Sequence, residues 1–294
     1  ARGHDDGGSW SGSAYVFRTT DGGATYGQVA KLKGADTTWY DQFGKSVAID
    51  GDTIVIGADG DDSDRGSVYV FRTTDGGVTY GQVAKLTADD AAEDDEFGGS
   101  VAIDGNTIVV GAQYAGTGGA VYVFLTTDGG ASYGQVAKLT AADAAVHDNF
   151  GGSVAIAGGT IVIGAYGDRP GDSYSSGYGR GSTYLFRTTD GGATYGQVAK
   201  LIASDAAGDD NFGNSVAIAG GTVVVGARYN DDTGSNSGSV YIFDANAPTS
   251  QPTHSLAPSM TPAPTVTPLT ADDSTIRTAV AAWLADPAAA EATY

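Results

Sequence analysis

Aspartate is the residue type in this sequence whose spacing could support binding chemistry. Asp59, Asp61, Asp62 and Asp64 fall within the short segment 59–64. Their carboxylates could form an oxygen cage for a cation, because Ca²⁺ takes about six to eight oxygen ligands. An acidic loop that only holds water would carry the same residues. Both interpretations are open on the sequence alone, and the solvated loop is the simpler one.

Other segments of variable sequence add further candidates for ligand binding. These candidates are acidic, aromatic or basic side chains: Asp168, Asp172, Tyr174, Arg180, Asp231 and Asp232. Catalytic groups are not arranged in a comparable way. The histidines, His4, His147 and His254, are scattered, and the absence of Cys excludes thiol nucleophiles, zinc–thiolate sites and disulfides. We therefore expect no enzymatic activity.

The net charge of −20, from 35 acidic and 15 basic residues, narrows the class of partner. A phosphate backbone or an anionic lipid surface would be repelled, so nucleic acid is not expected as a partner. No apolar run is long enough to cross a bilayer, so direct membrane insertion is not expected either. Gly accounts for 46 of 294 residues, and Val, Ile, Thr and Tyr are abundant, which predicts an all-β fold with many tight turns.

The elements that carry these residues repeat along the chain. Phe-Gly recurs at Phe43, Phe97, Phe150 and Phe212, and each copy is followed by Gly-Ala and then by a Tyr within an apolar run. All the variation in repeat length falls between Gly-Ala and that Tyr. A repeat whose other parts keep a constant length is a packed unit, and its variable segment is a surface loop.

Each repeat predicts four antiparallel strands, A to D, which in one copy are A (46–49), B (53–57), C (67–72) and D (80–86). Asp-Gly or Gly-Gly between A and B suits a two-residue hairpin, and strand B, apolar on both faces, belongs in the middle of a stack. Four such strands per repeat are typical of a propeller blade. Residues 1–243 therefore predict a β-propeller of four-stranded antiparallel blades, of which about five are represented.

The first residues match a later part of the repeat. Residues 1–15 align with 227–241, including Asp5-Asp6 with Asp231-Asp232. This match predicts that the chain is a fragment of a ring with more blades. It also predicts that strand D of the last blade comes from sequence upstream of Ala1.

The turn between C and D has the pattern Thr-x-Asp-x-Gly-x-Thr/Ser-Tyr in every copy. Its aspartates are Asp21, Asp75, Asp128 and Asp190. Asp can accept hydrogen bonds from turn amides, and Gly allows a positive φ. The turn resembles the Asp-box of sialidase-like propellers. A sialidase site also needs an arginine cluster and a Tyr nucleophile with a Glu partner, and no such cluster recurs here, so we interpret these turns as structural.

The Phe-Gly and Gly-Ala pattern resembles the FG-GAP repeats of integrin α-chain heads and their microbial relatives. The resemblance covers residues 1–243 and implies a β-propeller with an extracellular role in adhesion and ligand recognition. Several members bind calcium through an Asp-x-Asp-x-Asp-Gly loop between A and B. The A–B connections here, such as 50–53 and 157–160, are too short and carry too few oxygens for that loop. The usual calcium site is therefore not expected, no cofactor is certain, and calcium at the acidic loops stays open.

The ligand is expected where the B–C and D–A connections emerge together on one face of alternating blades. We expect a protein or a glycan to bind at this B–C/D–A loop face. Two Asp positions recur in the D–A connections, and we expect them to brace these loops through backbone amides. They are Asp36, Asp90, Asp143 and Asp205, and Asp41, Asp95, Asp148 and Asp210.

The composition changes after Phe243. Residues 244–268 are rich in Pro, Ser and Thr, which predicts a disordered, O-glycosylated stalk. Residues 269–294 begin with an amphipathic helix that carries Trp283, and this stretch resembles the start of a lipoprotein surface-repeat (BspA-like) domain.

Together these patterns predict a secreted or cell-surface glycoprotein. Its propeller would be a non-catalytic module for ligand recognition and adhesion. The alternative is an accessory, non-catalytic propeller of a larger secreted enzyme. A propeller hydrolase is disfavoured because no catalytic constellation is present.

Overall fold

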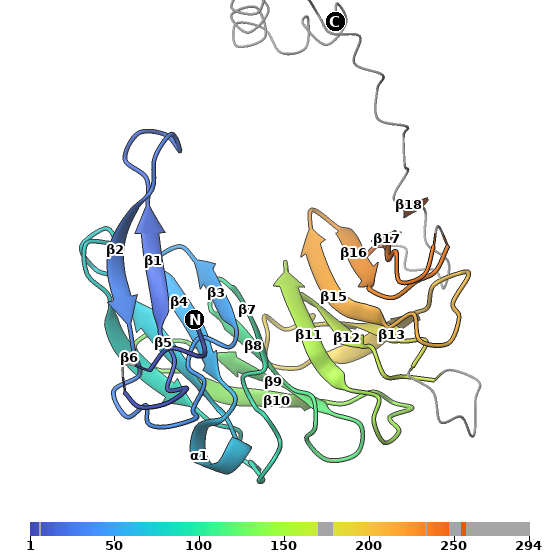
Figure 1. Cartoon of the computed structure of the whole chain (residues 1–294), viewed down its shortest axis with the longest axis horizontal. Coiled ribbons are helices and arrows are strands. Elements are labelled where there is room, and N and C mark those ends of the chain that lie inside the picture. The colour runs from blue at the N-terminus through green and yellow to red at the C-terminus, as the bar shows by residue number, and fades with distance from the viewer. Residues whose placement is uncertain (6, 170–178, 233, 247–253, 257–294) are drawn as a thin grey trace, which may run out of the picture. The chain divides into compact units, whose positions relative to one another are not determined.

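The structure, a computed structural model of the chain, describes residues 1–5, 7–169, 179–232, 234–246 and, for the backbone, 254–256 (Figure 1). All of these residues belong to one unit, Ala1–Pro258. The candidates Asp172 and Tyr174 lie outside the described residues. So do most of the predicted stalk at 244–268 and the whole segment 269–294.

Strands of the described residues form five antiparallel sheets, which follow one another along the chain. The first sheet is a pair, β1 (Ala14–Arg18) and β2 (Gly27–Leu32). The second contains β3 (Val47–Asp50), β4 (Thr53–Ala58), β5 (Ser67–Arg72) and β6 (Gly81–Leu86). The third contains β7 (Ser100–Asp104), β8 (Thr107–Ala112), β9 (Ala120–Leu125) and β10 (Gly134–Leu139).

The fourth sheet contains β11 (Phe150–Ala157), β12 (Thr160–Ala165), β13 (Ser182–Arg187) and β14 (Gly196–Leu201). The fifth contains β15 (Phe212–Ala219), β16 (Thr222–Ala227), β17 (Ser239–Asp244) and β18 (His254–Leu256). In every four-stranded sheet, strands that are neighbours in sequence are neighbours in the sheet. The predicted all-β propeller of four-stranded antiparallel blades is confirmed: each four-stranded sheet is one blade with strands in the order A to D, and β1 and β2 are strands C and D of the first blade.

Position within a blade decides how far a strand is buried. The B strands β4 and β12 are buried at every residue, because each lies between two other strands and between two neighbouring blades. The D strand β6 exposes most of its residues. Strands A and B join through the predicted tight turn, where Gly51 has a φ of 51°. Both features follow from the sequence pattern.

Apolar side chains fill the spaces between neighbouring blades. One cluster joins Val55 and Val70 of the second blade to Ile108 and Tyr122 of the third. Phe97, from a Phe-Gly pair, is fully buried in that cluster and contacts the Tyr122 ring edge to face, with 5.5 Å between the ring centroids. The other three Phe-Gly pairs repeat this contact with the Tyr of the following C strand.

Two glycines of the repeat meet at each boundary between complete blades. A Cβ added to Gly111 of β8 would lie 2.0 Å from the carbonyl oxygen of Gly151 in the next blade, and one added to Gly164 would lie 1.9 Å from the carbonyl oxygen of Gly213. Ser100 Oγ donates a hydrogen bond to the same Gly151 carbonyl at 2.7 Å. The Gly-Ala and Phe-Gly motifs are therefore needed because one backbone touches the next there.

The fourth strand of the last blade differs from the prediction. We expected it to come from sequence upstream of Ala1. In the structure its place beside β17 is taken by β18, from the Pro-, Ser- and Thr-rich segment, with Val240 opposite Leu256. The physical reason is that the free edge of β17 offers unpaired backbone N–H and C=O groups, which an extended segment can satisfy.

Candidate functional site

The B–C and D–A connections lie together at one end of the propeller, which we call the B–C/D–A end. Backbone hydrogen bonds tie each D–A loop to B–C loops. Gly60 N donates to Asp41 O at 3.2 Å, and Glu96 N donates to Asp64 O at 2.8 Å. Figure 1 shows the B–C turn α1 (Asp61–Asp64) at this end, opposite the turn between β1 and β2.

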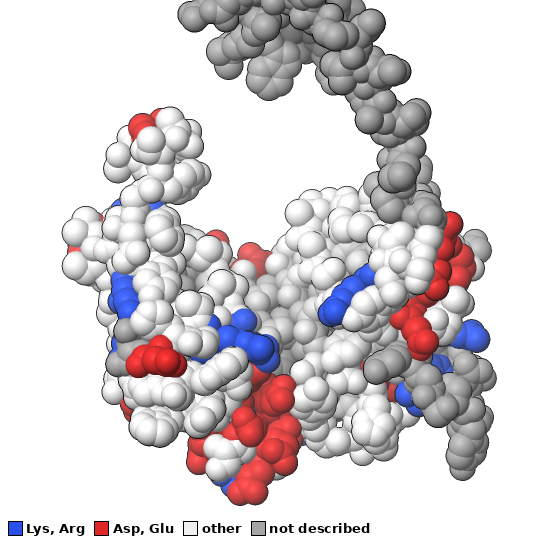
Figure 2. Space-filling model, in the orientation of Figure 1, with Lys and Arg blue, Asp and Glu red and all other residues white. Residues whose placement is uncertain are grey.

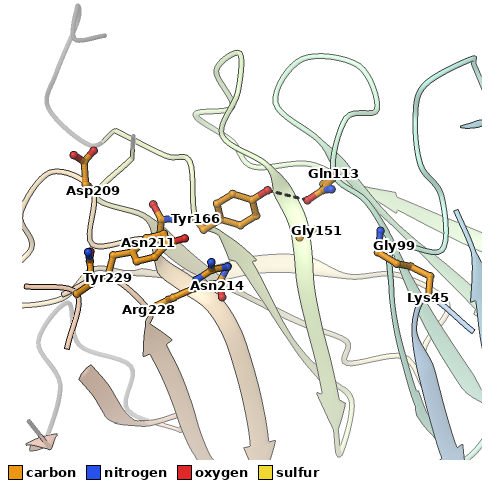
Figure 3. A pocket seen from close by; sticks show the side chains of 12 residues that line it. Lys45, Gly99, Gln113, Gly151, Tyr166, Asp209, Asn211, Asn214, Arg228 and Tyr229 are labelled. Atoms are coloured by element: carbon orange, nitrogen blue, oxygen red, sulfur yellow. Dashed lines mark hydrogen bonds between the residues drawn. The ribbon is translucent and has the colours of Figure 1, made fainter. Parts of the chain in front are cut away.

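A cavity of about 630 Å³ opens among these loops (Figure 3). Four consecutive blades contribute to its lining. The residues are Lys45, Gly99, Gln113, Gly151, Gly152, Tyr166, Asp209, Asn211, Asn214, Arg228, Tyr229 and Asn236. This volume is in the usual range for sites that bind small molecules.

Most of the residues that line this cavity come from two positions of the repeat, and their residue types change from copy to copy. The residue after each Phe-Gly pair is Lys45, Gly99, Gly152 and Asn214 in the four copies, and all four line the cavity. The residue after each Gly-Ala pair is Asp59, Gln113, Tyr166 and Arg228. The last three of these line the cavity, and Asp59 pairs with Lys45 behind it. Glycine contacts hold the backbone at both positions, yet the side chains vary from copy to copy.

Hydrogen bonds orient the polar groups on one side of the cavity. Tyr166 donates its hydroxyl to Gln113 Oε1 at 3.1 Å, and Gln113 Nε2 donates to Glu96 Oε2 at 3.1 Å (Figure 3). Burial, with smaller effects from Tyr114 and Glu96, raises the pKa of Tyr166 to about 12. Burial also raises the pKa of Glu96. Tyr166 is therefore a neutral hydroxyl at physiological pH.

The other side of the cavity carries amide and guanidinium groups. Arg228 stacks over the Tyr229 ring, with its Cζ 4.4 Å from the ring centroid, and forms no ion pair with a described residue. Asn211 is 7% exposed, and its Oδ1 accepts no hydrogen bond within the described part of the chain. A buried amide oxygen without a donor is costly, so this position calls for a water or a ligand.

A family comparison explains the repeat. The model of the FG-GAP repeat matches residues 26–71, 80–124, 133–186 and 195–243. The chain belongs to the FG-GAP repeat family. Each matched segment begins at the Tyr of a C–D turn and ends at the Phe of the next C strand. One FG-GAP repeat therefore covers strand D of one blade and strands A to C of the next, so it contains the contacts that join them.

Other comparisons add little to this assignment. The crystal structure of Sqt1 from Saccharomyces cerevisiae is similar with a TM-score of 0.43 and 10% sequence identity, over 70% of this chain and 46% of that chain. The chain thus spans less than half the length of Sqt1. A comparison with curated proteins found no match. Within the described residues there is no helix of sufficient length and apolar character to cross a membrane.

Aspartates of the FG-GAP loops form a repeated cluster between blades. Asp143, in the loop from the third to the fourth blade, accepts hydrogen bonds from Tyr184 at 2.9 Å and Lys200 at 2.6 Å. Asp168 accepts from the same Lys200 at 2.6 Å. Burial opposes ionisation of Asp143, but the hydrogen bonds from Lys200 and Tyr184 outweigh it and lower the pKa of that carboxyl. The same arrangement occurs two blades earlier, at the second blade, with Asp36, Tyr69, Lys85 and Asp61.

The two sets of D–A aspartates thus brace the loops in different ways. Asp41, Asp95, Asp148 and Asp210 are buried and accept hydrogen bonds from the backbone amide three residues before them, as expected. The other set bonds side chains instead: Asp36, Asp143 and Asp205 accept from the Tyr of the following blade, and Asp90 pairs with Lys138. The aspartates of the C–D turns each accept bonds from turn residues. Asp128, for example, accepts the Ser132 amide and hydroxyl at 2.9 and 2.6 Å.

The structure does not gather Asp59, Asp61, Asp62 and Asp64 into one group. Asp59 is 2% exposed and forms an ion pair with Lys45. Asp61 is buried against Ser67 and Lys85. Asp62 and Asp64 are exposed, in the acidic area that Figure 2 shows around α1. Across the described residues, no three His, Cys, Asp or Glu side chains are placed to hold a metal ion.

The remaining predicted residues are distributed over the loops. Asp168 is buried within the Lys200 cluster, and Arg180 is half-buried. Asp231 and Asp232 are exposed, and Asp231 accepts a hydrogen bond from the Asn236 amide at 2.6 Å. None of these four residues is among the described residues that line the cavity. Sequence reasoning missed Gln113, Tyr166 and Arg228 because it chose residues farther along the variable B–C segments, and these three stand at the start of those segments. The signal that could have found them is that the residue directly after each Gly-Ala pair changes from copy to copy although its place in the repeat is constant.

Proposed function

We propose that this FG-GAP propeller is a non-catalytic recognition module of a secreted or cell-surface protein, and that it holds its ligand in the cavity at the B–C/D–A end. One observation carries the proposal: the cavity is lined from two positions that the repeat holds in fixed register, of which one differs in all four copies (Asp59, Gln113, Tyr166 and Arg228, the last three lining the cavity) and the other is Lys, Gly, Gly and Asn. Positions that hold the frame, such as the glycines of the Phe-Gly and Gly-Ala pairs, are instead the same in all four copies. FG-GAP repeats are also typical of extracellular proteins.

The chemistry of the lining supports binding rather than catalysis. A general acid or base needs a pKa near the working pH and a partner within hydrogen-bond reach. Lys45 is occupied by Asp59, and the Tyr166 hydroxyl keeps its proton. Among the described lining residues the carboxylate is Asp209, which is exposed and forms no ion pair with Arg228. These groups can orient a ligand without activating a nucleophile.

The test is to fill the cavity and measure binding on a glycan array and on immobilised extracellular-matrix proteins. Gly99→Tyr suits this purpose because an added Cβ meets only Glu96 O, at 3.3 Å, and Gly99 has no positive φ. Gly134→Tyr is the matched control, since it lies in an open place at the start of β10, beyond the C–D turn.

We expect at least one probe to bind the wild type, Gly99→Tyr to abolish that binding, and Gly134→Tyr to leave it unchanged. Circular dichroism and thermal melts would establish that both variants fold. Binding that survives Gly99→Tyr in a folded protein would place the ligand elsewhere and contradict the proposal.

A further inference from the structure

The cavity lining also indicates what kind of ligand it holds. We propose that the site takes a neutral saccharide. This inference rests on the proposed function, because it names the ligand class for the same cavity. Three observations lead to it: the balance of charge, the type of hydrogen-bonding group, and the aromatic rings at its edge.

Charge argues against an ionic ligand. The Lys45 ammonium is neutralised by the buried Asp59 carboxylate, and the remaining charged lining residues are Asp209 and Arg228, one of each sign. A polyanion would meet a protein of net charge −20. A cationic peptide would be repelled by Arg228 and Lys45, and the described lining residues include no cluster of acidic side chains that could bind it.

The polar groups of the lining both donate and accept hydrogen bonds. Gln113, Asn211 and Asn214 carry amides, each with two donors and an accepting oxygen, and Tyr166 carries a hydroxyl. Sugar hydroxyls have the same dual character, so they complement such groups better than an acid or an amine does. The bonds from Tyr166 to Gln113 and from Gln113 to Glu96 hold that amide in one orientation before a ligand arrives. Little ordering would then be needed on binding.

Aromatic rings supply the apolar part of the contact. Tyr166 is half-buried in the lining and Tyr229 stands beside it, held by the Arg228 guanidinium at 4.4 Å. Figure 3 shows Tyr166 between Gln113 on one side and Asn211, Asn214 and Tyr229 on the other. The C–H face of a sugar can pack on such rings while its hydroxyls reach the neighbouring amides, because tyrosine combines a broad apolar ring with a polar tip.

The experiment measures binding of three matched probe sets by calorimetry and on an array: neutral oligosaccharides of glucose, galactose, mannose and N-acetylglucosamine; the same types carrying sialic or uronic acids; and short Arg- and Lys-containing peptides. We expect the neutral set to bind. Asn214→Ala and Gln113→Ala should each weaken that binding about tenfold, the effect of one lost hydrogen bond. Gly99→Tyr should abolish it and Gly134→Tyr should not change it.

Two results would overturn the inference in different ways. If an acidic saccharide or a basic peptide binds in its place and Gly99→Tyr removes that binding, the ligand class is wrong while the cavity remains the site. If neutral saccharides bind equally well to the folded Gly99→Tyr variant, the cavity is not the site and the proposed function fails with the inference. An absence of binding by every neutral probe, while a matrix protein binds in a manner sensitive to Gly99→Tyr, also refutes only the saccharide.

Discussion

Replacing one glycine at a blade boundary tests whether the repeat motif exists to bring two backbones together. Gly111→Ala places a Cβ 2.0 Å from the Gly151 carbonyl oxygen, a backbone atom of the next blade. Gly226 occupies the same place in the last copy, but a Cβ there meets only the Ser215 hydroxyl, at 2.5 Å, which can rotate away. Neither glycine has a positive φ, so backbone strain does not differ between them.

The expected magnitudes differ accordingly. Overpacking a tight interior contact costs about 1–3 kcal/mol, and here the obstacle is backbone. Loss of chain entropy in the unfolded state returns about 0.4–1 kcal/mol for any Gly→Ala change. We therefore expect Gly111→Ala to lower the free energy of unfolding by about 2 kcal/mol and Gly226→Ala to change it by less than about 0.5 kcal/mol.

Urea unfolding followed by far-ultraviolet circular dichroism would measure both variants. The slope of free energy against urea should stay constant, since the two folded states expose the same surface. Equal destabilisation by the two substitutions would refute the reasoning, because within the described residues no atom of another blade lies near a Cβ at Gly226. In that case the glycine would matter for its own strand and not for the boundary.

Three further outcomes follow from the same contacts. The pKa of Asp143 is lowered, so its contribution to stability is present above the unfolded pKa of about 3.9 and is lost as the pH falls through the folded value. Melting temperatures measured from pH 7 down to 2.5 should therefore fall less steeply for Asp143→Asn than for the wild type. The control is Asp62→Asn, whose side chain is 72% exposed and whose melting temperatures should follow those of the wild type. Thr126 is 3% exposed and accepts a hydrogen bond from the Gly130 amide at 2.8 Å, so Thr126→Val should cost about 2 kcal/mol in urea unfolding while the exposed Thr140→Val costs almost nothing. Arg72 donates to the Gly129 carbonyl of the next blade, so Arg72→Met should speed hydrogen exchange at the turn 126–132, and unchanged exchange there would contradict a role in joining the blades.

The fold could be read from the sequence because its determinants are local and recur. The Phe-Gly and Gly-Ala pairs, the buried B strands and the Gly51 turn were each predicted from a few adjacent residues, and the structure has them in place. Strand β18 was not predicted. It pairs with β17 through backbone groups, so no pattern of side chains in the sequence predicts it.

The acidic loop shows why part of the site was beyond sequence reasoning. Asp59 and Asp61 looked like cation ligands because they stand close together in the chain. Their partners are Lys45, in the connection before β3, and Lys85, on β6, and only the fold shows that these ammonium groups have already neutralised them. The cavity depends likewise on Gln113, Tyr166 and Arg228, which come from three different blades and meet only in space.

Under the proposed function, the separation of the residues that hold the frame from those that line the cavity would let the propeller change its ligand. The frame is held by contacts of glycine backbones, buried Phe and Tyr rings, and the Asp–Tyr–Lys clusters between blades. Gln113, Tyr166 and Arg228 each follow a Gly-Ala pair directly, so the frame fixes their backbone positions while their side chains point to the cavity and take no part in those contacts. A substitution at such a position leaves the glycine contacts of the boundary in place, although one at Tyr166 or Gln113 removes the hydrogen bond between their side chains. The four copies have Asp, Gln, Tyr and Arg there while keeping the glycine of every Phe-Gly and Gly-Ala pair.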